Sequence, residues 1–361
     1  MYLCDRKLSD VIIHHFIITD MKQYTHAWLA MLAIKRLEKI EIPETVNASG
    51  KPTPLARDAK LLVRLFKNYR DFVVTGAWYP DHVLSDNAGD YSHSLKHTTF
   101  LAGEKPQFFK MPDTMEVYQY MKSHSPIYKN KVPYLVVKGN LHDRCDAMAH
   151  TIVDNFKIQY HEEKGNPILP SSTHMALRFF MLSHYLADAH MPLHCDARPL
   201  GKIHASIEGE WENQIKKSYN IDMDNERFFY DPNGYPLATA DMTPLIKAVE
   251  EKVITRPFNY SWGSADGTRE YAQAIGQYSF MLAQEMFPES LGDCTLTQYK
   301  KSEVFANFDK YSAMLMADAV DSIARAWLHV WVRYRNWGPD YNLVNAAAEE
   351  KKKAKAQETQ A

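Results

Sequence analysis

A short stretch in the middle of the chain holds five residues with the types and spacing of metal ligands. His184 and Asp188 are four residues apart, as are His204 and Glu208, so each pair would lie on one face of a helix. Between the pairs, His194 follows a proline that cannot continue the first helix, which predicts a turn there. Imidazole and carboxylate groups together suit zinc and similar divalent metals.

The first pair continues an apolar helical stripe. It belongs to a set spaced 4, 3 and 4 residues apart, which is the pattern of an inward-facing helix surface: Leu177, Met181, His184 and Asp188. A buried carboxylate is costly unless a metal or an arginine compensates its charge. For one pair alone, a structural His–Asp hydrogen bond is the simpler interpretation. The second pair and His194 change that balance, and the cluster as a whole favours metal binding.

These ligands need helices that begin and end in the right places. The helix of the first pair is expected to be capped by one of three hydroxyl residues, Ser171, Ser172 or Thr173. Upstream, Thr25 is predicted to cap a helix from His26 to about Ile40. Apolar residues surround almost the whole circumference of that helix, which predicts a central position in the fold.

The remaining patterns are mostly helical. A helix is predicted from Ala56 to Val74 with Gly76 at its C-terminal end, then a turn from Ala77 to Asp81 and a polar loop through His97. Residues 220–242 look like a loop excursion. Strand patterns are few and no internal repeat is visible, so the expected fold class is all-α, a multi-helix bundle with a metal cleft. Four further helices complete it, besides one at Thr114–Ser123: Asp143–Glu163, Pro244–Val253, Arg269–Met286 and Phe308–Tyr334.

Length and charge set broad limits. The 361 residues are expected to form one helical domain over residues 24–340, after an N-terminal segment, residues 1–23, that fits either a strand or a helix start. Residues 341–361 are a charged tail without an apolar face, which predicts disorder. A net charge of −2 provides no basic field for tight non-specific duplex binding, although it is compatible with cleaving a phosphodiester inside a cleft.

Cysteine and hydropathy patterns bear on the compartment. Sixteen histidines against four cysteines without a C-x-x-C spacing indicate imidazole rather than thiolate ligands. The apolar run Val11–Ile18 is interrupted by His14 and His15 and lacks a following cleavage site, so it is a poor signal peptide. No run approaches the length of a transmembrane helix. The expected location is therefore cytoplasmic.

Four upstream residues are additional candidate ligands. His26 lies in the first turn of the apolar helix, where a histidine is more often a core residue. Asp81 follows Trp-Tyr-Pro and is either a held, half-buried carboxylate or an ordinary turn residue. His93 and His97 are four residues apart in a polar loop, where solvated side chains are the simpler interpretation.

With these residues in view, the chain resembles the zinc-dependent phospholipase C and single-strand nuclease superfamily. The core motif of that family is H-x3-D, a histidine six residues after the aspartate, then H-x3-E or H-x3-D. It is matched here by His184, Asp188, His194, His204 and Glu208. Weaker matches upstream are Thr25-His26-Ala27-Trp28, Tyr79-Pro80-Asp81 and Ser92-His93, with His97 as the alternative to His93. The order of elements agrees from about residue 24 to 336.

The resemblance implies a mostly helical fold and three zinc ions in one cleft. One zinc would be held by Asp81, by His93 or His97, and by His184 and Asp188. A second would be held by His194, His204 and Glu208. The third would be held by His26 and would share Asp188 as a bridge. In the family, the backbone of an N-terminal Trp also holds the third zinc, but this chain has no Trp before Trp28, so two sites are expected and the third depends on a substitute such as His14 or His15.

The expected activity is hydrolysis of a phosphodiester by a metal-activated water, with Asp81 orienting or deprotonating that water. A phospholipase C-like substrate is favoured because the last ligand is Glu208, as in the phospholipases, and because the interval from His194 to His204 is short. The first alternative is a single-strand-preferring nuclease or nucleotidase, for which an aromatic content of 12% would supply base-stacking groups. The second alternative is a non-catalytic, metal-stabilised binding protein.

Overall fold

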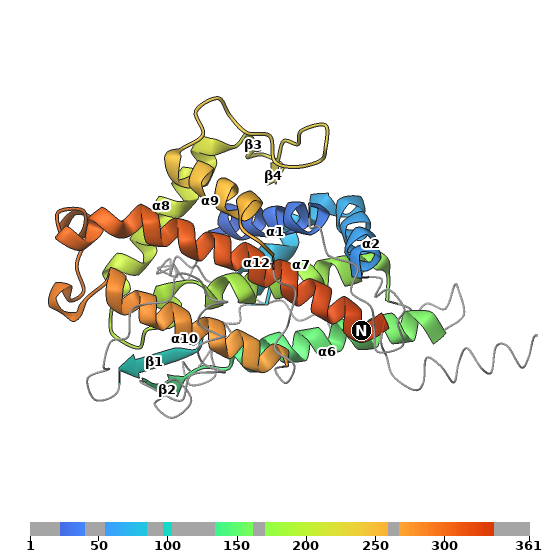
Figure 1. Cartoon of the computed structure of the whole chain (residues 1–361), viewed down its shortest axis with the longest axis horizontal. Helices are drawn as coiled ribbons and strands as arrows, with labels where there is room; N and C mark the ends of the chain where they lie inside the picture. The colour runs from blue at the N-terminus through green and yellow to red at the C-terminus, as the bar shows by residue number, and fades with distance from the viewer. Residues whose placement is uncertain are drawn as a thin grey trace, which may run out of the picture.

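The computed structural model describes residues 22–39, 55–84, 97–102, 134–161, 170–258 and 267–335. Helices dominate these segments, and the strands among them form two short antiparallel pairs (Figure 1). The expected all-α class is therefore confirmed. The predicted helix at Thr114–Ser123, the candidate ligand His93, residues 1–21 and the charged tail lie outside the described residues.

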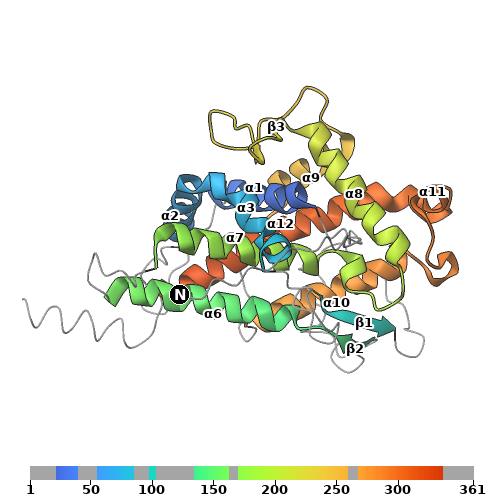
Figure 2. The same cartoon turned by 180° about the vertical axis from the view of Figure 1, so that it is seen from behind.

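The longest helix, α12 (Phe308–Arg335), runs through the middle of the molecule and packs against α1, α6, α7 and α9 (Figures 1 and 2). Its Trp327 is fully buried, and the ring centroid lies 4.5 Å from that of Phe66 on α2 (Leu55–Asn68). The indole N–H of Trp327 donates to the carbonyl of Phe179, at 2.8 Å. These contacts join α2, α7 and α12 into one hydrophobic core.

Helix α1 (Gln23–Glu38) is buried almost all round, as its composition predicts. The predicted start of this helix is wrong, since its N-cap is Lys22 and Thr25 lies inside the first turn. Thr25 instead donates its backbone N–H and its hydroxyl to Glu212, at 2.9 and 3.0 Å. Thr25 has the residue type of an N-cap, but its hydroxyl bonds to Glu212 on a distant helix, which the local sequence does not indicate.

The segment after α2 differs most from expectation. Instead of one helix to Val74 and a turn to Asp81, α2 is followed by a 3-10 turn (Arg70–Phe72) and by α3 (Val73–His82), which contains Pro80. Gly76 does not end a helix: it allows α3 to approach α7, since a Cβ there would lie 2.8 Å from Cβ of Phe180. The Trp-Tyr-Pro-Asp segment is thus helical, and Asp81 extends from the last turn of α3.

The central motif folds as predicted. α7 (Ser172–Ala189) is capped by Ser171, whose hydroxyl accepts the backbone N–H of His174 at 3.1 Å. A 3-10 turn, η3 (Pro192–His194), ends that helix, and α8 (Gly201–Ser218) follows. The other helices agree with their predicted positions within a few residues: α6 (Leu141–His161), α9 (Pro244–Thr255) and α10 (Thr268–Met286).

The strands are short and peripheral. β1 (Thr99–Ala102) pairs antiparallel with β2 (Tyr134–Lys138), and β3 (Ile221–Asp222) with β4 (Arg227–Phe228) within the predicted loop excursion. Three short helical turns lead into α12: η4 (Glu289–Leu291), α11 (Leu296–Tyr299) and η5 (Glu303–Asn307). Among the described helices, none has the length and apolarity needed to cross a membrane.

Candidate metal centre

The first ligand pair lies on the buried face of α7. His184 and Asp188 are 0% and 1% exposed, and Nε2 of His184 lies 3.1 Å from Oδ2 of Asp188. The other ring nitrogen of His184 donates to the carbonyl of Ala77 on α3, at 2.7 Å. Because a carbonyl can only accept, Nδ1 carries a proton, so in the neutral ring Nε2 is the lone-pair nitrogen that faces the carboxylate.

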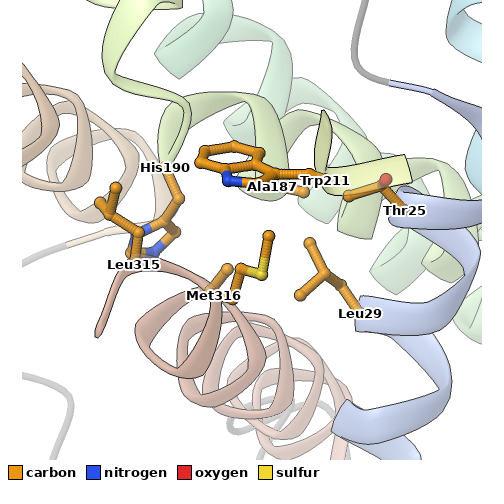
Figure 3. A pocket seen from close by; sticks show the side chains of 8 residues that line it. Thr25, Leu29, Ala187, His190, Trp211, Leu315 and Met316 are labelled. Carbon is orange, nitrogen blue, oxygen red and sulfur yellow. The ribbon is translucent and has the colours of Figure 1, made fainter. Parts of the chain in front are cut away.

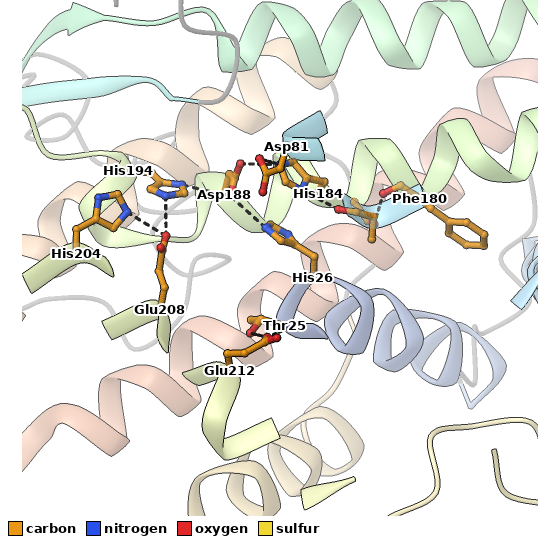
Figure 4. Close-up of polar contacts among 12 residues, drawn as sticks. Thr25, His26, Asp81, Phe180, His184, Asp188, His194, His204, Glu208 and Glu212 are labelled. Carbon is orange, nitrogen blue, oxygen red and sulfur yellow. Dashed lines mark hydrogen bonds and ion pairs between the residues drawn. The ribbon is translucent and has the colours of Figure 1, made fainter. Parts of the chain in front are cut away.

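Helix α3 also supplies Asp81, whose Oδ1 lies 3.3 Å from Nε2 of His184. The contact of α3 with α7 through Gly76 thus brings a second carboxylate to the same imidazole nitrogen (Figure 4). The side chain of Asp81 is 9% exposed, whereas that of His184 is fully buried. Both carboxylate oxygens of Asp81 are nevertheless buried, and its predicted place beside His184 is found in the structure.

Helix α1 brings His26 to the opposite oxygen of Asp188. Nε2 of His26 lies 3.5 Å from Oδ1 of Asp188, and its ring stacks on His184 with centroids 3.9 Å apart. The oxygens of Asp188 therefore face different imidazoles, as a carboxylate bridging two cations would. Neither ring nitrogen of His26 has a hydrogen-bond partner among the described residues, which is unusual for an ordinary core histidine and compatible with a ligand.

The second ligand group is formed by η3 and α8. Nε2 of His194 and Nε2 of His204 each lie 3.0 Å from Oε1 of Glu208. Glu208 is fully buried, whereas the side chain of His204 is 22% exposed. The predicted association of these three residues is therefore present, with His204 at its accessible edge.

The position of His97 depends on β1. Phe100 of β1 bonds to the segment after His194: its N–H donates to Cys195 O at 2.9 Å, and its carbonyl accepts from Ala197 at 3.0 Å. The ring of His97 consequently lies against that of His194, with centroids 4.2 Å apart. Of the two alternatives considered above, the structure brings His97 to the cluster, while His93 lies outside the described residues.

Glycine at position 139 is required by this arrangement. Gly139 has φ +109°, and a Cβ on it would lie 1.9 Å from the carbonyl oxygen of His97. The neighbouring Thr98 is held by His142, whose Nδ1 lies 3.0 Å from the threonine hydroxyl. The junction between β2 and α6 thus holds the backbone that carries His97.

The cluster concentrates charge where water is excluded. Burial lowers the pKa of His26 to about 3, with the neighbouring His184 adding to the effect. Burial is the largest single effect and opposes protonation of His184 and His194. Asp188, together with Asp81 at His184 and with Glu208 at His194, outweighs it and raises the pKa of each to about 10. These two imidazoles in turn hold the pKa of Asp188 well below its usual range, despite its burial. Buried carboxylates here need cationic compensation.

The donor set and its spacing fit zinc. A tetrahedral zinc with bonds of about 2.0–2.1 Å separates its ligand atoms by roughly 3.3–3.4 Å. The nitrogen–oxygen separations around Asp188 are 3.1, 3.3 and 3.5 Å. Among the described residues, neither oxygen of Asp188 has a partner with hydrogen-bond geometry, although both are buried. Buried polar atoms are usually satisfied, so this arrangement is compatible with a cation site. Within the described part of the chain, two groups have ligand atoms within 4.8 Å of one another: His26, His184 and Asp188, and His194, His204 and Glu208.

Sequence reasoning missed one polar partner of the cluster's scaffold. Glu212 is buried and receives the first turn of α1, one turn beyond Glu208 on α8. The i,i+4 spacing from Glu208 was a visible signal that Glu212 shares its helix face. Asp196, close to the cluster in sequence, pairs instead with Arg198 and with Gln284.

Two comparisons with known proteins gave no match. No protein-family model matches the chain, and no curated protein matches it significantly. The function therefore has to be argued from the residues of the site.

Proposed function

We propose that this protein is a zinc-dependent hydrolase of phosphodiester bonds, of the phospholipase C type. The observation that carries the proposal is the environment of Asp188. Its buried oxygens face three imidazoles at 3.1–3.5 Å, and within the described segments no contact to them has hydrogen-bond geometry. The second group, around Glu208, would hold a further cation. The family that the chain resembles also uses more than one zinc ion.

The residues divide into those that hold cations and one that acts on water. His26, His184 and Asp188, with Asp81 beside them, would hold cations on one side, and the Glu208 group would hold one on the other. When bound, zinc lowers the pKa of a water and neutralises the oxygens of a phosphate group. The carboxylate of Asp81, 3.3 Å from Nε2 of His184, orients or deprotonates the attacking water.

A phospholipid is the favoured substrate class. Within the superfamily that the chain resembles, a glutamate as the last ligand is a feature of the phospholipases rather than the nucleases, and so is a short interval such as that from His194 to His204. The net charge of −2 also offers no basic field for a nucleic acid.

The test combines metal analysis with turnover. The purified chain, supplied with zinc, is analysed for metal content and assayed on phosphatidylcholine vesicles and on single-stranded DNA. Release of phosphocholine that is lost in Asp81→Asn is the expected result. If DNA is turned over and phosphatidylcholine is not, the nuclease alternative is favoured over the phospholipase. If zinc is bound and neither substrate is turned over, the proposed enzymatic function is contradicted, and a metal-stabilised binding protein is favoured.

A further inference from the structure

The N-terminus of α1 has an unusual anchor. Its N-cap residue, Lys22, makes no side-chain cap, so the first N–H groups of the helix need another acceptor. The carbonyl of Lys22 accepts the N–H of Thr25 at 3.0 Å. Glu212 on α8 is a second acceptor: it receives the N–H and hydroxyl of Thr25 at 2.9 and 3.0 Å and the N–H of Tyr24 at 3.4 Å. A carboxylate at this end of a helix is also favoured by the helix dipole.

This anchor adjoins the candidate metal centre on both helices. Thr25 immediately precedes His26, which faces Asp188. Glu212 follows Glu208 by one helical turn, so α8 presents a candidate ligand and the anchor of α1 on one face (Figure 4). Glu212 pairs with Lys216, at 3.4 Å, and accepts the N–H groups of α1, although burial outweighs these contacts and raises the pKa of its carboxyl. It belongs to neither of the two ligand groups.

A small cavity lies on another side of Thr25, between α1, α7, α8 and α12 (Figure 3). Leu29, Ala187, Trp211 and Met316 contribute to its walls. The side chains that line this cavity make fewer van der Waals contacts there, so the bonds to Glu212 supply part of what holds the first turn of α1.

We propose that Glu212 is a positioning residue for His26: it fixes the first turn of α1 on α8, and so sets the distance from His26 to Asp188. The inference rests on the proposed function, since the position of His26 matters to function only if the centre holds metal. Glu212 touches neither the substrate nor the cation. Its loss is expected to weaken the cation that depends on His26, and to spare the His194–His204–Glu208 group.

The experiment measures binding of Zn²⁺ and Co²⁺ alone, by elemental analysis and by absorption titration, without any assay of turnover. In Glu212→Ala, the affinity of the ion lost in His26→Ala should fall roughly 10- to 100-fold, as for other groups that orient ligands. Glu212→Gln should restore it, because an amide oxygen at the place of Oε2 keeps both bonds from Thr25. Glu210→Ala is the matched control, since Glu210 lies on the same helix and pairs with Lys300.

A double variant separates positioning from general destabilisation. His26→Ala with Glu212→Ala should bind no less metal than His26→Ala alone, because both changes act on the same ion. Thr25→Val, which removes only the hydroxyl bond, should give a smaller loss and covers the case in which Glu212→Ala does not fold. Parental affinity in folded Glu212→Ala, or loss of the Glu208 group, would overturn the role of Glu212. A parent chain that binds neither metal would instead overturn the metal centre and the proposed function with it.

Discussion

Nδ1 of His194 lies 3.3 Å from Oδ1 of Asp188, while Nε2 of the same ring lies 3.0 Å from Oε1 of Glu208. One imidazole therefore faces both carboxylates that anchor the two ligand groups. If Nε2 serves the Glu208 group, Nδ1 carries the proton and points to Asp188, the arrangement in which a carboxylate orients a metal-binding histidine. Asp188 is then a ligand of one group and an orienting residue of the other.

Asp188→Asn is accordingly expected to be the most damaging single change. It should abolish metal at the His26–His184 side and lower affinity at the Glu208 group roughly 10- to 100-fold, with activity lost. Elemental analysis and chelator competition measure both effects. Asp196→Asn is the control, because it alters another buried aspartate that pairs with Arg198. Full zinc content in Asp188→Asn would contradict the shared role.

Glu208→Ala should remove one equivalent of metal. His194 and His204 would remain as a pair of imidazoles, which bind zinc more weakly than a complete three-ligand site. Elemental analysis after dialysis should show partial loss, while Glu210→Ala keeps the parental content. Unchanged metal in Glu208→Ala would transfer the ligand role to another carboxylate.

Asp81→Asn separates chemistry from folding. The amide keeps the shape of the side chain but cannot accept a proton, and loss of a general base typically lowers a rate roughly 10²–10⁴-fold. The metal content of the Glu208 group and the melting temperature should change little. Steady-state turnover of phosphatidylcholine vesicles and of single-stranded DNA, together with elemental analysis, compares Asp81→Asn with the parent. A rate close to that of the parent would withdraw Asp81, and His97 with it, from the site.

Gly139→Ala should disturb the segment that carries His97. The added Cβ would clash with the carbonyl of His97, and φ of +109° is unfavourable for alanine. A cost of about 1–3 kcal/mol in the free energy of unfolding is expected. Gly209→Ala is the control, since no atom lies within 4 Å of a Cβ there, and it should raise helix stability by about 1 kcal/mol. Denaturant unfolding of both variants tests the difference, and equal stabilities would refute it.

Metal binding should release protons. In the metal-free chain, the carboxylates of Asp188, Asp81 and Glu208 raise the pKa of His184 and His194 from 6.5 to about 10, against the effect of burial. The stabilisation from these bound protons is fully present below pH 6.5 and is lost as the pH rises through 10. Metal affinity should therefore increase over the same interval, because zinc displaces the protons. Calorimetric titration with Zn²⁺ in buffers of different ionisation enthalpy should reveal proton release at pH 7.5. A binding enthalpy independent of the buffer would exclude it.

The site could be predicted from sequence where its residues are close along the chain. His184, Asp188, His194, His204 and Glu208 lie on helices and a turn whose caps and breaks are local signals, and their positions agree with prediction. The predicted structure around Asp81 was wrong: a turn was expected, because Gly76 and Pro80 usually indicate a helix end, but the segment is helical. Here Gly76 serves the approach of α3 to α7, a tertiary contact that no local pattern contains. The contact between Thr25 and Glu212 could not be predicted for the same reason, since the two residues are far apart in the sequence.

The Glu208 group and the His26 group differ in how much chain separates their members. His194, His204 and Glu208 lie within fifteen consecutive residues, so a partly folded chain can bring them together at small cost in loop-closure entropy. His26 reaches Asp188 only after α1 has docked on a helix far along the sequence. Folding kinetics should thus have an order, in which the local group captures its ion first and the distant group forms last, when the native core is complete.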